Sequence, residues 1–142
     1  MDTKRVVADF EDWREAVAEA VALLENGGLV ALPTETVYGL AADAFDAEAV
    51  SKVFEVKERP SFDPLIVHIG HKRDLDIVAK VPEELDEIVD ELVSTYWPGP
   101  LTLVLPKKED VPELVTSGLE TVAVRMSAHE VMRAGAKEIP GA

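Results

Sequence analysis

Two cations, Lys57 and Arg59, stand two residues apart where a predicted helix must end before Pro60. Lys and Arg number only 14 in the chain, so two at one helix end could form an anion clamp for phosphate or carboxylate. The alternative is structural, because positive charge near a helix C-terminus stabilises the helix by about 0.3 to 1 kcal/mol. The spacing alone leaves both interpretations open.

Two further polar residues interrupt apolar runs that are typical of buried strands. His68 lies within the run 65–69, and Arg125 follows the run 122–124 on the same face as Thr121. A histidine in a strand is either a hydrogen-bonded core residue or a group that binds a ligand carboxylate or hydroxyl. A buried, unpaired guanidinium would be very costly, so Arg125 must contact a carboxylate, a ligand or solvent at the strand end.

A polar segment, Thr34-Glu35-Thr36, follows the first predicted strand. Ligand sites in α/β sheets lie beyond the carboxyl ends of strands, which favours a binding role for this segment. An ordinary Ser/Thr turn is the alternative. Taken with the Lys, His and Arg residues above, it indicates a pocket for a ligand that carries phosphate or carboxylate.

Composition excludes several kinds of site. The chain has no Cys, so disulfides, thiolate nucleophiles and Cys-ligated zinc are ruled out. The P-loop, the glycine-rich dinucleotide motif, the HExxH zinc motif and the GxSxG elbow are also missing, and no metal site is predicted. A net charge of −14 disfavours nonspecific binding of nucleic acid. Without an apolar run near its start, the chain is expected to be cytoplasmic, with no membrane partner.

The elements that position these residues follow from apolar periodicity and turn signals. We predict helices over 9–26, over 46–59 and over 83–96, and strands over 29–32, 65–69, 101–105 and 121–126. Alternation of this kind predicts an α/β or α+β domain, an open, twisted, mixed sheet with helices packed on it. The length of 142 residues predicts a single domain over 1–142.

Several local expectations can be checked separately. The run 65–69 is expected as a central strand, and residues 33–40 as a strand end or loop. Residues 97–100 are expected as a rigid turn with a packed indole. The helix over 83–96 is expected to leave its acidic face in solvent and to bury four apolar side chains: Leu85, Ile88, Val89 and Leu92.

Five short sequence segments resemble those of a known family. The sequence resembles the YrdC-like family of threonylcarbamoyl-AMP synthases over about residues 15–130, with the matching strings in the family's order and spacing. They are PTETVYGL at 33–40, KERP at 57–60, PLIVHI at 64–69, WPGPLTLVL at 97–105 and SGLETVAVRM at 117–126.

The resemblance implies an open α/β fold with a concave cleft, and an enzyme. Such an enzyme condenses L-threonine, bicarbonate and ATP into threonylcarbamoyl-adenylate and pyrophosphate, with Mg²⁺. The product is used to modify adenosine 37 of tRNAs. The enzyme would therefore act on tRNA only indirectly, through downstream transfer machinery. Carried over by position, the implied L-threonine site comprises Thr36, His68, Thr121 and Arg125. The implied ATP site comprises Lys57, Arg59, Asp63, Thr116 and Ser117, with Lys57 and Arg59 as the catalytic pair.

The sequence departs from the family pattern in three respects, one of which is that the match fades after His129. Asp63 stands where the family has Asn, and the family's Ser-x-Asn signature is absent. We therefore expect a shortened domain that lacks the last part of the nucleotide site. Two other functions remain open: a noncatalytic module that binds nucleotide or RNA, and a carbamoyltransferase-type domain of hydrogenase maturation that uses carbamoyl phosphate.

Overall fold

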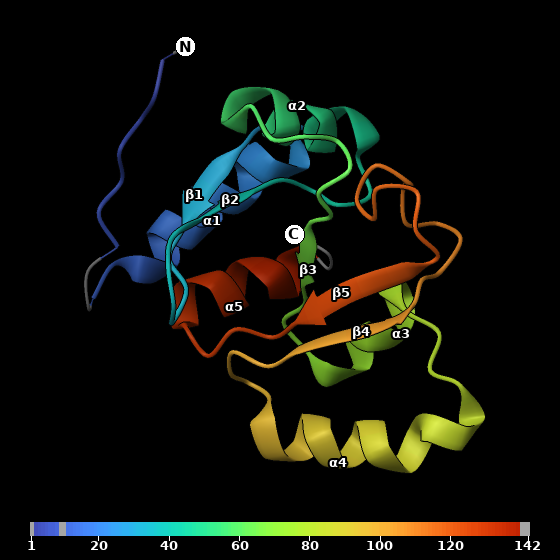
Figure 1. Ribbon diagram of the computed structural model, residues 1–142. Coiled ribbons are helices and arrows are strands. Elements are labelled where there is room, and N and C mark those ends of the chain that lie inside the picture. Colours follow the sequence, from blue (N-terminus) through green and yellow to red (C-terminus); the bar gives the residue numbers. More distant parts are fainter. Residues whose placement is uncertain (1, 9–10, 140–142) are drawn as a thin grey trace.

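The computed structural model describes residues 2–8 and 11–139 (Figure 1). Its α-helices are interspersed with short strands along the chain, in the order α-β-β-α-β-α-α-β-β-α. Two 3₁₀ turns, Lys72–Asp74 and Glu83–Leu85, precede the third and fourth helices. The elements in chain order are α1 (Trp13–Glu25), β1 (Val30–Leu32), β2 (Gly39–Ala41), α2 (Ala47–Lys57), β3 (Ile66–His68), α3 (Leu75–Val78), α4 (Asp86–Tyr96), β4 (Thr102–Pro106), β5 (Thr121–Arg125) and α5 (Glu130–Glu138).

The strands of the described part form two small sheets. β1 and β2 pair antiparallel, while the second sheet has the order β3-β5-β4, with β3 parallel and β4 antiparallel to β5. The mixed α/β class is therefore confirmed. The prediction of β3 as a central strand is wrong, because β5 lies between β3 and β4. An apolar run does not report how many neighbours a strand has, and Ile66 of β3 is itself 46% exposed.

Separate apolar clusters support the two sheets. The larger one surrounds β3, β4 and β5, where Val124 and Ile69 are fully buried, and it includes side chains of α2, α3 and α4. The second lies between β1, β2, α1 and α5 and includes Leu24. Figure 1 shows α5 next to the β1–β2 sheet, just after the chain leaves β5. Polar contacts near the end of β5 therefore matter for how the two sheets are joined.

The helix α2 forms as its sequence predicts. The Asp46 carboxylate accepts hydrogen bonds from the backbone N–H groups of Glu48 (3.1 Å) and Ala49 (3.2 Å), which caps the N-terminus. Val50, Val53 and Phe54 are buried on one face. Helix α1 begins at Trp13, later than predicted, and Asp9, the predicted cap, lies outside the described residues.

The buried face of α4 differs from the prediction. Leu85 and Ile88 are 37% and 56% exposed, whereas Val89 and Val93 are buried and Leu92 is half-buried. The reason is that residues 83–85 form a separate 3₁₀ turn, so the α-helical periodicity starts at Asp86 and places another stripe inward. The acidic side chains of this helix are exposed, as expected.

Trp97 confirms the expected packed turn after α4, because it is 3% exposed and its Nε1–H donates to the carbonyl of Leu101 at 2.8 Å.

The sequence analysis missed β2, α3 and α5. Of the helices in the described part of the chain, none combines the length and apolar character needed to cross a membrane.

Gly70, just after β3, allows α5 to pack closely. A Cβ atom there would lie 2.6 Å from the Cα of Lys137, well inside van der Waals contact. We expect Gly70→Ala to lower the free energy of unfolding in urea by about 1 to 3 kcal/mol, because backbone must move to admit the methyl group. Gly39→Ala is the matched control, since a Cβ there meets nothing within 4 Å. Equal stability of the two variants would contradict this close packing.

Candidate functional site

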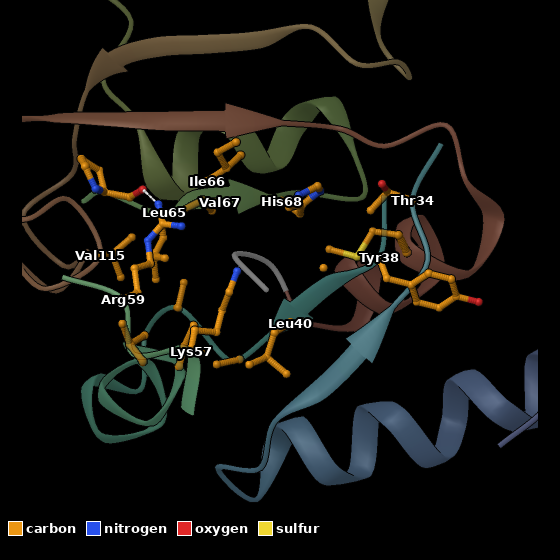
Figure 2. Close-up of a pocket in the computed structure, with 18 of the residues that line it drawn as sticks. Thr34, Tyr38, Leu40, Lys57, Arg59, Leu65, Ile66, Val67, His68 and Val115 are labelled. Atoms are coloured by element: carbon orange, nitrogen blue, oxygen red, sulfur yellow. Dashed lines mark hydrogen bonds between the residues drawn. The ribbon is translucent and has the colours of Figure 1, made fainter. Parts of the chain in front are cut away.

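A cavity of about 310 Å³ lies between α2, β2, β3 and the turn at residues 34–38. Figure 2 shows Lys57 and His68 facing this space, with Arg59 at one end and Thr34 and Tyr38 at the other. Most of the remaining wall is apolar: Val37, Leu40, Ala41, Ala42, Ala44, Val50, Val53, Leu65, Ile66, Val67, Val115 and Met132. An apolar hollow with a few convergent polar groups is typical of a small-molecule site.

Lys57 and Arg59 both reach the cavity because of how α2 ends. Lys57 is the last residue of the helix, and Glu58 adopts a left-handed backbone conformation with φ of 52°. This conformation stops the helix, and the N–H of Arg59 then donates back to the carbonyl of Phe54 at 2.9 Å. The two cations expected at the phosphate end therefore line the same cavity.

Arg59 also holds the loop that leads into β3. Its Nε and Nη2 donate to the carbonyls of Asp63 (3.1 Å) and Pro64 (2.7 Å). Nη2 lies 3.3 Å from the Asp63 carboxylate, which is half exposed to solvent. Asp63 therefore sits beside the cation, where its charge partly offsets that of Arg59, and it does not line the cavity itself.

The sheet face beneath the cavity carries the residues expected to bind threonine. His68 of β3 pairs in register with Arg125 of β5, and residues opposite each other in a sheet share a face. His68 lines the cavity directly. Thr121 shares the face of Arg125 but stands at the other end of β5, about 13 Å away at the usual rise per strand residue. This is the placement that the predicted strand over 121–126 implies, and a threonine contact from Thr121 stays a prediction.

The Arg125 guanidinium contacts a carboxylate, one of the three partners that the sequence analysis allowed. Its Nη2 donates to Oε1 of Glu35 and, at 3.1 Å, to Oγ1 of Thr36. The Arg125 side chain is 11% exposed and that of Glu35 is 22% exposed. Nε of Arg125 and Nδ1 of His68 are buried and have no hydrogen-bond partner in the described part of the chain.

Glu35 receives two more hydrogen bonds on its other oxygen. Oε2 accepts from the hydroxyl of Ser127 at 3.1 Å and from the backbone N–H of Ala128. Burial by itself would raise the pKa of Glu35, but the hydrogen bonds from Ala128, Arg125 and Ser127, with the charge of Arg125, outweigh it and lower the pKa. The carboxylate is therefore ionised at neutral pH.

The turn that carries Glu35 is closed by its own side chains. Oγ1 of Thr34 accepts from the backbone N–H groups of Thr36 and Val37, both at 3.2 Å, and donates to the carbonyl of Val37. This is the Ser/Thr turn that the sequence allowed as the structural alternative. It also lines the cavity through Thr34 and Val37, so the structural and binding interpretations are compatible.

His68 lies in a low-dielectric position beside a positive charge. Burial lowers its pKa, and the charge of Arg125 lowers it further, while Glu35 partly counteracts; together they bring the pKa to about 4. His68 is thus neutral at pH 7, which suits a hydrogen-bonding role more than a proton transfer near neutrality.

Thr116 and Ser117 lie in the loop before β5, outside the cavity wall. Thr116 is fully buried, and its hydroxyl donates to the carbonyl of Leu119 at 2.8 Å, which closes the loop. Ser117 has a left-handed backbone with φ of 55°, and its Oγ is buried without a partner among the described residues. Their assignment to ATP stays a prediction.

No acidic cluster suited to a metal ion accompanies these residues. Among residues 2–8 and 11–139, no three His, Asp or Glu side chains are grouped so that they could hold a metal.

Ser127 and Ala128 are site residues that the sequence analysis missed. Neither has a residue type or spacing that points to chemistry, and each matters only through its contact with Glu35, more than 90 positions away in the chain.

The chain is similar to proteins of known activity. A family described as "Telomere recombination" (Sua5_yciO_yrdC) matches residues 22–140. The threonylcarbamoyl-AMP synthase of Pyrococcus abyssi is 51% identical over 122 residues, which is 86% of this chain and 34% of that protein. The enzyme of the same name from Bacillus subtilis is 45% identical over 144 residues, which is 97% of this chain and 40% of that protein.

A solved structure of one relative is also similar to this chain. The crystal structure of P. abyssi Sua5 complexed with L-threonine aligns with a TM-score of 0.82 and 45% identity, over 97% of this chain and 38% of that chain. The chain thus spans between a third and two-fifths of the length of these relatives.

The low pKa of His68 makes stability depend on pH. The imidazole stays neutral down to about pH 4 in the folded protein but titrates near pH 6.5 in the unfolded chain. The free energy of unfolding is therefore undiminished by His68 above pH 6.5 and falls as the pH drops toward 4. Between pH 7.5 and pH 5 we expect wild type to lose about 2 kcal/mol more unfolding free energy than His68→Gln. Parallel pH dependence of both proteins in urea denaturation would contradict the burial of a neutral His68.

Proposed function

The chain belongs to the Sua5/YciO/YrdC family, and from that premise we propose that it makes threonylcarbamoyl-adenylate from L-threonine, bicarbonate and ATP. The observation that carries the proposal is one cavity lined by Lys57, Arg59 and His68, with Arg125 opposite His68 in the neighbouring strand. Because net charge is −14, such local convergence of cations gives an anionic substrate a specific place to bind.

L-threonine is proposed to bind at the end formed by His68, Arg125 and Thr36. A guanidinium can bind the amino-acid carboxylate with parallel hydrogen bonds, and Arg125 retains donors beyond the Nη2 that contacts Glu35. Neutral His68 has an unpartnered Nδ1 and can hydrogen-bond the substrate. The complex of P. abyssi Sua5 with L-threonine, at 45% identity, supports this choice of ligand. Thr121, farther along β5, remains a proposed contact.

ATP is proposed to bind with its phosphates at Lys57 and Arg59. Lys57 supplies a mobile point charge, and Arg59 supplies a guanidinium that the Asp63–Pro64 loop holds in a fixed orientation. Phosphate oxygens would compete with the exposed Asp63 carboxylate for Arg59. Thr116 and Ser117 would join this end of the site through the loop before β5.

The reaction then needs orientation and charge stabilisation more than acid–base chemistry. The threonine amine and bicarbonate form a carbamate with loss of water; a carbamate oxygen attacks the α-phosphorus of ATP, and pyrophosphate leaves. Negative charge accumulates on the phosphate oxygens, which Lys57 and Arg59 stabilise. The cavity holds both substrates, which reduces the entropy cost of bringing them together.

Magnesium ion is proposed as a companion of the nucleotide. The ion would bind the ATP phosphates, as Mg²⁺ commonly does in nucleotide-using enzymes. The product would pass to separate machinery that modifies tRNA, which explains how an acidic protein serves RNA modification without a basic surface. A cytoplasmic location fits these substrates.

The proposal predicts turnover that depends on the two cations. The 142-residue chain, supplied with ATP, Mg²⁺, threonine and bicarbonate, should release pyrophosphate, and Lys57→Ala or Arg59→Ala should slow release about a hundredfold or more through loss of charge stabilisation. Lys80→Ala is the matched control, because Lys80 is a surface cation paired only with exposed Glu109, and its rate should stay unchanged.

Absence of both turnover and threonine-dependent thermal stabilisation would refute the proposal. Stabilisation by threonine and by ATP without any pyrophosphate would instead favour the noncatalytic binding module.

A further inference from the structure

Glu35 lies where the two sheets meet at the cavity. It belongs to the turn between β1 and β2, while the three groups that bind its carboxylate belong to β5 and the segment after it. The two main apolar clusters that support the sheets are separate, and a third, small cluster of Ala42, Ala49 and Val53 packs the end of β2 against α2. The Glu35 carboxylate is thus a polar bridge between two bodies whose relative placement shapes the cavity.

Both oxygens of the carboxylate are already engaged. Oε1 faces the Arg125 guanidinium and Oε2 faces Ser127 and Ala128, so both oxygens are occupied by protein donors rather than free for a substrate. Glu35 instead controls the orientation of Arg125. Nη2 of Arg125 is held between Glu35 and Thr36, and this contact orients the guanidinium plane. Arg125 in turn stands opposite His68, a cavity residue.

The same carboxylate also locates the cavity wall. Thr34 hydrogen bonds make the turn at 34–37 a rigid unit, and Thr34 and Val37 of that unit line the cavity. Glu35 supplies three of the four side-chain contacts described between this turn and β5 with the segment after it, the fourth being Thr36 with Arg125, so its loss should let the turn shift as a unit. A displacement of about 1 Å in such a wall is enough to reduce substrate binding or turnover greatly.

We propose that Glu35 is a positioning residue of the threonine site, which sets Arg125 and the 34–37 turn in the arrangement that binds the amino-acid substrate. This inference rests on the proposed function. It assigns Glu35 a role in threonine affinity and not in nucleotide affinity, because Lys57 and Arg59 have no contact with its hydrogen-bond network in the described structure.

The test is the affinity for L-threonine and, separately, for ATP, measured by isothermal titration calorimetry on folded variants. Glu35→Gln keeps the shape of the side chain, but its NH₂ group faces either Arg125 or Ser127 and Ala128 and cannot accept their hydrogen bonds. We expect its threonine affinity to fall at least about tenfold, as when an outer partner of a binding side chain is removed. Glu35→Asp keeps the charge but is too short to span Arg125 and Ala128, and should weaken threonine binding to a smaller extent.

ATP affinity should stay within about twofold in both variants, a difference of under half a kcal/mol. The matched control is Glu109→Gln, the same chemical change in an ion pair whose carboxylate side chain is 92% exposed; its threonine affinity should equal that of wild type. If Glu35→Gln fails to fold, Glu35→Asp carries the test.

Two results overturn the inference while the proposed function stands: wild-type threonine affinity in folded Glu35 variants, or equal losses for threonine and ATP, which would show general loosening. Failure of wild type itself to bind threonine overturns the proposed function, and the inference with it.

Discussion

The ion pair between Glu35 and Arg125 is the interaction on which the site depends. It joins a turn of one sheet to the central strand of the other, and both side chains are largely withdrawn from solvent. A partly buried charge pair needs further hydrogen bonds to compensate for lost hydration, and Ser127, Ala128 and Thr36 supply them. The pair thereby fixes the turn whose Thr34 and Val37 line the cavity.

The charge distribution explains how an acidic chain can bind anions. Most of its 28 carboxylates serve as solvated surface, as on α4, whereas Lys57, Arg59 and Arg125 lie at or beside one hollow. Each guanidinium has a carboxylate neighbour, Asp63 or Glu35, and these carboxylates orient the cations. His68 stays neutral beside Arg125, so it adds a hydrogen-bonding group without adding repulsion between cations.

Local chemistry made part of this site predictable from sequence. Asp46 and Pro60 delimit α2, so Lys57 and Arg59 had to project from a helix end, and the cost of burying a guanidinium required a partner for Arg125. The identity of that partner could not be predicted, because Glu35 is 90 positions away and the contact depends on tertiary structure. For the same reason, the edge position of β3 and the roles of Ser127 and Ala128 became visible only in three dimensions.

The most direct measurement is a crystal structure of this chain grown with L-threonine. The account predicts the amino-acid carboxylate against the Arg125 guanidinium, with His68 and Thr36 nearby and the contact between Glu35 and Arg125 retained. Threonine bound away from β5, or a guanidinium that leaves Glu35 and turns out of the cavity, would contradict it.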